Sequence, residues 1–72
     1  MNTNNDIINP RLTRREIEIL KYVSEGKTSK FIGSVLYISK QTVDKHRKNM
    51  LKKTGARNSI ELVQEFLSKF MS

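Results

Sequence analysis

Apolar residues recur at intervals of three and four positions along most of the chain, and this is the spacing of amphipathic helices. No segment shows the alternation of apolar and polar residues that is typical of a strand. The pattern therefore predicts an all-α fold, a compact domain of four helices joined by short connections. The predicted helices span residues 14–25, 29–36, 40–53 and 59–70.

The first predicted helix has the clearest boundaries. Thr13 and Glu16 have the spacing of a capping box, in which each side chain accepts a hydrogen bond from the other residue's backbone N–H. Leu12 and Ile17 have the spacing of the apolar pair that often packs across the start of a helix. Gly26 is predicted to end this helix, because glycine adopts the left-handed conformation without a steric penalty.

The second and third helices are predicted to form a helix-turn-helix. Thr28 and Ser39 are suitable caps for their first turns, and only a short turn separates the two helices. Gly33 lies inside the second helix, where glycine costs about 0.5–1 kcal/mol relative to alanine. A close approach of the next helix would explain this glycine, and simple tolerance of the residue is the alternative.

The third helix has two contrasting faces. An advance of about 100° per residue places Val43, Met50 and Thr54 near one line, with His46 and Leu51 at its edges, and this is the predicted core face. Four long polar side chains lie opposite: Gln41, Lys45, Lys48 and Lys52. Because few acids are available to pair with these lysines along the helix, the pattern favours a surface that meets an anion.

The positive charge is concentrated around this helix. The 72 residues contain 14 Lys and Arg against 7 Asp and Glu, for a net charge of +7. Residues 40–57 hold seven cations and one anion, and so carry +6 of that charge. A solvated helix face is one interpretation of this run. A polyanionic partner is the other, since neutralised phosphates release condensed counterions.

The third helix is therefore predicted to enter the major groove of double-stranded DNA. Lysine can bond to guanine O6 and N7, and aspartate to cytosine N4. The predicted base-contacting residues are Gln41, Asp44, Lys45 and Lys48. The predicted phosphate contacts are Lys40, Thr42, Arg47, Lys52 and Arg57, with Arg14, Arg15 and Lys30 as further candidates.

The chain resembles the LuxR/GerE type of helix-turn-helix, which includes the output domains of NarL-like response regulators. The resemblance runs without a gap from about residue 12 to 63, through LTRREIEIL, EGKTSKFI and LYISKQTVDKHRKNMLKKTGARN. It implies a transcription regulator in which the third of four helices reads DNA and the fourth commonly makes a dimer contact. It also implies base contacts for Asp44, Lys45 and Lys48, and backbone contacts for Thr42 and the Arg57-Asn58 turn.

The sequence departs from the family pattern at three positions. Residue 44 is often basic in relatives, so Asp44 bears on the base preference and the affinity. Thr54 stands where the family usually has a larger apolar residue, and Phe31 stands where it usually has a glutamate. These last two changes concern packing and surface more than the mode of DNA binding.

The last helix has a wide apolar band. Ile60, Val63, Leu67 and Met71 form one stripe, and a single core-facing stripe usually suffices for such a helix. The surplus residues Leu62, Phe66 and Phe70 are predicted to form a homodimer interface, which would require a pseudo-palindromic DNA site. The alternative is that they cover the end of the core within a monomer.

Phe31 and Val35 lie together on the flank of the second helix. One interpretation is a contact surface for RNA polymerase or another regulator. The other is that they pack beneath a tail containing Ile7 and Ile8.

Other functions find less support in the sequence. The chain has no cysteine, its one histidine, His46, cannot hold a metal alone, and no catalytic constellation is present, so we expect neither an enzyme nor a cofactor. No apolar run approaches the ~20 residues that span a bilayer, and residues 1–10 do not have the pattern of a signal peptide. We expect a cytoplasmic, nucleoid-associated protein with a flexible arm at residues 1–10 and the domain at 11–72.

Two alternative functions remain from the sequence. A region-four-like module of a sigma factor uses a similar helix-turn-helix. A protein-interaction bundle, such as an anti-activator, would dock its basic face on an acidic partner. A membrane-surface protein is disfavoured, since that role needs only one continuous amphipathic helix.

Overall fold

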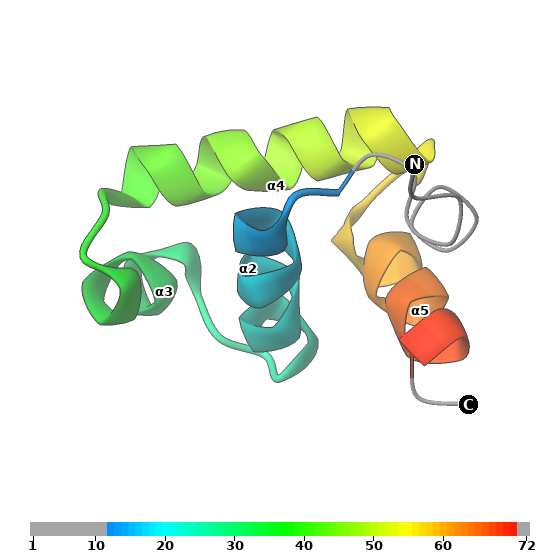
Figure 1. The fold of residues 1–72 in the computed structure, drawn as a ribbon, viewed down its shortest axis with the longest axis horizontal. Coiled ribbons are helices and arrows are strands. Elements are labelled where there is room, and N and C mark those ends of the chain that lie inside the picture. Colours follow the sequence, from blue (N-terminus) through cyan, green and yellow to red (C-terminus); the bar gives the residue numbers. More distant parts are fainter. Residues whose placement is uncertain (1–11, 71–72) are drawn as a thin grey trace.

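Four helices make up the computed structural model, which describes residues 12–70: α2 (Arg14–Ser24), α3 (Ser29–Leu36), α4 (Lys40–Thr54) and α5 (Ser59–Phe70). The predicted all-α class is confirmed, and each helix boundary lies within one residue of its predicted position. Helix α4 is the longest, and Figure 1 shows α2, α3 and α5 together on one side of it. The opposite side of α4 is covered by no described helix in this view.

Helix α2 begins with the predicted capping box. The backbone N–H of Glu16 donates to Thr13 Oγ1 at 3.1 Å, and the backbone N–H of Thr13 donates to Glu16 Oε1 at 3.0 Å. The helix ends at Ser24, one residue before the predicted end. Gly26 follows with a φ of 84°, which is the left-handed conformation that its position required.

The turn of the helix-turn-helix contains one residue whose conformation the sequence did not predict. The caps are as expected, since Thr28 Oγ1 accepts from the N–H of Phe31 and Ser39 Oγ accepts from that of Thr42. Tyr37, however, adopts the left-handed conformation with φ 61° and ψ 40°. A residue with a Cβ is uncommon there, so Tyr37 adds strain to the turn.

Gly33 is required by a close approach of the chain. A Cβ at this position would lie 2.6 Å from the carbonyl oxygen of Ile38 and 3.3 Å from the carbonyl carbon of Ser39. Both atoms belong to the backbone of the turn, which cannot move aside as a flexible side chain can. The predicted close approach is confirmed, and most of it comes from the turn that precedes α4 rather than from the helix itself.

The core lies between α4 and the other three helices. The buried apolar side chains are Ile19, Leu20, Ile32, Val43, Met50, Leu62 and Phe66. Val43 and Met50 are fully buried, which confirms the predicted core face of α4. Thr54 lies at the edge of this face, where its hydroxyl donates to the carbonyl oxygen of Met50 at 2.8 Å.

Helix α5 is rotated relative to the prediction. Leu62 and Phe66 were predicted to form a surface for a second subunit, but they pack inside the domain, with 3% and 7% of their surface exposed. Ile60 and Leu67, predicted to face the core, are 70% and 40% exposed. The apolar band covers about half of the helix, so periodicity alone did not show which part faces inward. The side chain of Phe70 lies outside the described residues, as do Met71, Ile7 and Ile8.

Candidate nucleic-acid interface

The outward face of α4 carries the predicted polar stripe. Its members are Gln41, Lys45, Lys48 and Lys52, and all four are exposed. They lie on the opposite side of α4 from the buried Val43 and Met50. Figure 1 shows the other three helices packed together on one side of α4, and the core lies between them and α4, so the stripe belongs to the side away from them. None of the four side chains makes an ion pair or a hydrogen bond to another described residue. Their amines and amide are therefore available to an external ligand.

Asp44 lies beside this stripe. Unlike the side chains of the stripe, its carboxylate has partners in the domain for both oxygens. Oδ1 accepts from the Ser29 hydroxyl at 2.6 Å, and Oδ2 accepts from Lys40 Nζ at 2.7 Å. The hydrogen bond from Lys40, followed by that from Ser29, holds the pKa of the Asp44 carboxyl below its ordinary value of 3.8. The carboxylate thus stays charged, and the ion pair with Lys40 offsets that charge.

Arg47 lies where the starts of α3 and α5 meet the middle of α4. Its guanidinium donates to Ser29 Oγ at 3.1 Å and to Ser59 Oγ at 3.3 Å, and these serines are the first residues of the two helices. The side chain is half-buried as a result. Because a guanidinium has five N–H donors, Arg47 retains donors for a phosphate after these two bonds.

The remaining predicted phosphate contacts lie at helix starts. Thr42 is exposed in the first turn of α4, and its hydroxyl is 2.9 Å from that of Ser39. Arg57 precedes α5, and 85% of its side chain is exposed although its guanidinium pairs with Glu61 at 2.7 Å. Asn58 Oδ1 accepts from the N–H of Glu61 at 2.9 Å, which leaves its amide N–H groups without a described partner.

The three further phosphate candidates are all exposed. Arg14 and Lys30 make no ion pair with another described residue, whereas Arg15 pairs with Glu18 at 3.3 Å.

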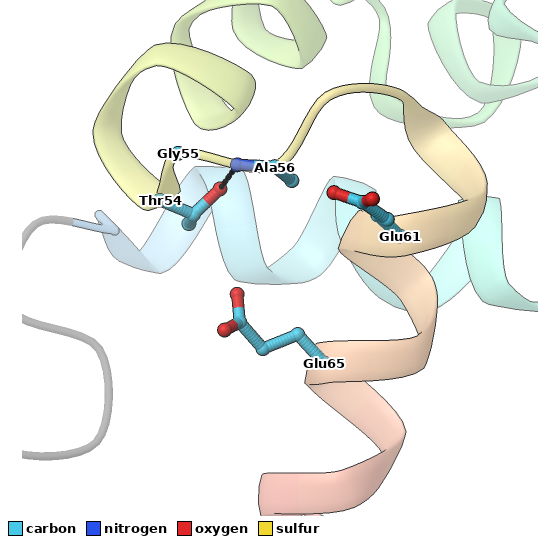
Figure 2. Close-up of a pocket in the computed structure, with 5 residues that line it drawn as sticks. All are labelled: Thr54, Gly55, Ala56, Glu61 and Glu65. Atoms are coloured by element: carbon cyan, nitrogen blue, oxygen red, sulfur yellow. Dashed lines mark hydrogen bonds between the residues drawn. The ribbon is translucent and has the colours of Figure 1, made fainter.

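Glu61 also lines a hollow beside the connection between α4 and α5. The hollow is bounded by Thr54, Gly55, Ala56, Glu61 and Glu65. Figure 2 shows the two carboxylates on the α5 side, facing the connection. The backbone N–H of Arg57, and then its side chain, hold the pKa of Glu61 below its ordinary value of 4.5. Two acids make this hollow unsuited to a phosphate, so it is not part of the basic surface.

One long-range ion pair was not predicted from the sequence. Glu16, predicted only as a capping residue, is 2% exposed, and its carboxylate accepts from Lys53 Nζ at 2.8 and 3.0 Å. His46 Nδ1 lies 3.8 Å from the same carboxylate. Lys53 therefore points inward and differs from Lys52, its exposed neighbour on the stripe. The two residues of the ion pair are 37 positions apart, a separation at which no local pattern signals a contact.

Other kinds of site find no support in the described residues. None of the helices in residues 12–70 combines the length and the apolar composition that crossing a membrane requires. The same residues contain no group of three or more His, Cys, Asp or Glu side chains placed to hold a metal ion.

Comparison with known proteins gives a consistent result. A family model described as bacterial regulatory proteins, luxR family, matches residues 10–66. The spore germination protein GerE of Bacillus subtilis (strain 168) is 40% identical over 58 residues, which cover 81% of this chain and 78% of the relative. The response regulatory protein YgeK of Escherichia coli (strain K12) is 44% identical over 57 residues, and the regulatory protein SdiA of the same strain is 48% identical over 50.

The extent of these matches differs between relatives. The aligned residues cover 79% and 69% of this chain, but only 39% of YgeK and 21% of SdiA. The chain therefore spans less than half the length of either of these two relatives. No solved structure matches the chain.

Proposed function

The chain belongs to the luxR family of bacterial regulatory proteins, and we propose that it regulates transcription by binding double-stranded DNA in a sequence-specific way. In this proposal α4 enters the major groove and presents its outward face to the base edges. In this proposal the protein acts in the cytoplasm, on the nucleoid.

The observation that carries the proposal is the free polar stripe of α4. Three lysines and a glutamine stand exposed and unpaired on the side that no other described helix covers. A solvated helix face of ordinary composition gains from pairs of opposite charge four residues apart, and this stripe has none within it. Donors on a helix, with no competing partner in the domain, are what direct readout of a major groove requires.

The proposed contacts divide into two groups. Gln41, Lys45 and Lys48 would bond to base edges, because they lie along the centre of the exposed stripe. Phosphate contacts would come from the lysine at the C-terminal end of the stripe, from residues beside the stripe and from residues at the helix starts. These residues are Lys40, Thr42, Arg47, Lys52, Arg57 and Asn58. The first group would set sequence preference, and the second would set affinity and orientation on the duplex.

We further propose a homodimer formed through α5. Ile60 and Leu67 are exposed apolar residues of this helix, and burial of such residues against a second copy is favourable. A twofold dimer would bind a pseudo-palindromic site. This surface replaces Leu62 and Phe66, which the domain uses in its own core.

A second exposed apolar surface lies on α3. Phe31 and Val35 are 43% and 38% exposed, and Lys27 Nζ lies 5.1 Å from the centre of the Phe31 ring. In the proposed regulator this surface would contact RNA polymerase or another regulator.

Titration of duplex DNA at several salt concentrations tests the proposed function. We expect affinity to fall steeply between about 50 and 200 mM salt, because each phosphate contact releases counterions. We also expect a duplex selected from a random pool to bind at least about a thousandfold more tightly than unrelated duplexes. Equal binding to all duplexes would contradict sequence-specific recognition, and absence of binding at low salt would contradict DNA binding altogether.

A further inference from the structure

Asp44 is placed differently from the residues with which sequence analysis grouped it. To read cytosine, a carboxylate must turn an oxygen toward the N4 amino group in the groove. Here one oxygen of Asp44 is held by the Ser29 hydroxyl on α3 and the other by Lys40 on α4, at 2.6 and 2.7 Å. Both contacts are short, and although 46% of the Asp44 side chain is exposed, they tie each of its oxygens to a side chain of the domain.

The contact with Lys40 changes what that lysine can do. The ammonium of Lys40 and the carboxylate of Asp44 form an ion pair with no net charge. A lysine contributes to DNA affinity by replacing the counterions of a phosphate. For Lys40 to do so, it must either leave Asp44 or bring that negative charge up to the DNA backbone. Either event reduces the net gain from the contact.

The contact with Ser29 extends the influence of Asp44 to a second cation. The single hydroxyl hydrogen of Ser29 is donated to Asp44, so the oxygen offers its lone pairs to Arg47 Nη1 at 3.1 Å. Arg47 is therefore oriented in part by Asp44, through Ser29. Since Asp44 is the only acid in α4, no other carboxylate of the helix competes for these partners.

We propose that Asp44 is a positioning residue that limits the affinity of the domain for every DNA duplex and reads no base. It does so by holding Lys40 in an ion pair and by fixing the hydroxyl that orients Arg47. This inference rests on the proposed binding of duplex DNA. It replaces the direct cytosine contact predicted for this position, and it reduces the contribution to affinity of the phosphate contact proposed for Lys40.

The test compares five variants with the parent protein by titration with fluorescent duplexes. Asp44→Asn keeps the shape of the side chain and an oxygen for Ser29 but removes the charge. Lys40→Gln is made in the parent protein and in Asp44→Asn. Lys52→Gln, made in the same two backgrounds, is the matched control, because Lys52 is an exposed lysine of α4 with no described partner. The probes are a duplex selected from a random pool, its single base-pair variants and several unrelated duplexes. Thermal unfolding of each variant verifies that it is folded.

We expect Asp44→Asn to bind all duplexes more tightly, by about threefold to tenfold. The slope of log affinity against log salt concentration should become steeper, because about one more counterion is released on binding. Lys40→Gln should have little effect in the parent and a clear effect, about threefold or more, in Asp44→Asn. Lys52→Gln should weaken binding by the same factor in both backgrounds.

Two results would overturn the inference while leaving the proposed function intact. One is a loss of preference at a single base pair in Asp44→Asn, with other positions unchanged, because this is the behaviour of a base-reading residue. The other is an equal effect of Lys40→Gln in both backgrounds. If the parent protein binds no duplex at all, the proposed function and this inference fail together.

Discussion

The ionisable side chains of α4 differ in whether the domain already uses them. Lys45 and Lys48 have no partner in the described structure, whereas Asp44, Arg47 and Lys53 are held by other helices or by their own. This difference follows from their angular position, because only residues at the border of the core face can reach α2, α3 or α5. The free lysines are the ones proposed to contact base edges.

Loss of a single free lysine should change sequence preference. We expect Lys48→Ala or Lys45→Ala to cost roughly 1–3 kcal/mol on a selected duplex and much less on unrelated duplexes. Arg57→Ala should instead weaken all duplexes alike, because a phosphate contact carries no sequence information. Lys69→Ala, at the end of α5, is the control for loss of one charge. Identical behaviour of Lys48→Ala and Arg57→Ala on every duplex would contradict the division of roles.

The strained residue of the turn should respond to replacement by glycine. Tyr37 has a φ of 61° and is 93% exposed, so Tyr37→Gly relieves strain and loses little packing. We expect the free energy of unfolding in urea to rise by up to about 1 kcal/mol. Ser34→Gly, at an exposed helical position of α3, should lower it by about 0.5–1 kcal/mol. A similar decrease in the free energy of unfolding in both variants would show that Tyr37 is not strained.

At the level of helices, the sequence predicted boundaries well and orientation less well. Thr13, Thr28 and Ser39 cap their helices as predicted, because a cap depends on residues only three positions apart. The core face of α4 was also predictable, since apolar and polar residues separate cleanly around it. The face of α5 that packs on the core was not predictable, because the apolar band of this helix is too wide for periodicity to select one face.

In the candidate site, too, local features were predictable from the sequence and long-range contacts were not. Exposure of the lysine stripe follows from helical periodicity alone. The partners of Asp44 and Glu16 do not, since Ser29 and Lys53 lie 15 and 37 positions away in the chain. Such contacts depend on how the helices pack, and that arrangement is a property of the whole fold.

The hydrogen bonds at the helix borders make stability depend on pH. The pKa values of Asp44 and Glu61 are lowered in the folded state from ordinary values of 3.8 and 4.5. A carboxyl whose folded pKa is lowered stabilises the fold above its unfolded pKa, and this contribution is lost as pH falls through the folded pKa. We therefore expect the free energy of unfolding to fall below about pH 4.5.

Neutral variants test this dependence in urea titrations at neutral and acid pH. Asp44→Asn and Glu61→Gln should each be less stable than the parent at pH 7 and should lose less stability on acidification. Glu65→Gln, on the same helix as Glu61, is the control. An unchanged pH dependence in both test variants would contradict the proposed roles of these carboxyls.

For the whole molecule, the arrangement of the helices separates the surface proposed for DNA from the one proposed for a second copy of the chain. Helices α2, α3 and α5 pack on one side of α4 and leave its basic side uncovered (Figure 1). Helix α5 meets the others through Leu62 and Phe66 and exposes Ile60 and Leu67. The DNA-facing and self-associating surfaces proposed here therefore lie on different helices and can be disrupted separately.

Sedimentation measures the proposed dimer directly. We expect the parent protein to show a concentration-dependent dimer and Ile60→Glu to remain a monomer, because a charge at this position would have to be buried in the interface. Lys69→Glu introduces an acid at an exposed residue on the opposite side of α5 from Ile60 and should leave the dimer intact. A parent protein that stays monomeric at every concentration would end this proposal.

Titration of ¹⁵N-labelled protein with duplex DNA, followed by amide NMR, tests the central claim most directly. We predict that the largest shifts fall along α4, at and around Gln41, Lys45, Lys48 and Lys52, with smaller shifts at the starts of α3 and α5. Amide signals that stay unchanged on addition of DNA, or shifts that leave α4 unaffected, would contradict the claim that this helix is the DNA-reading element.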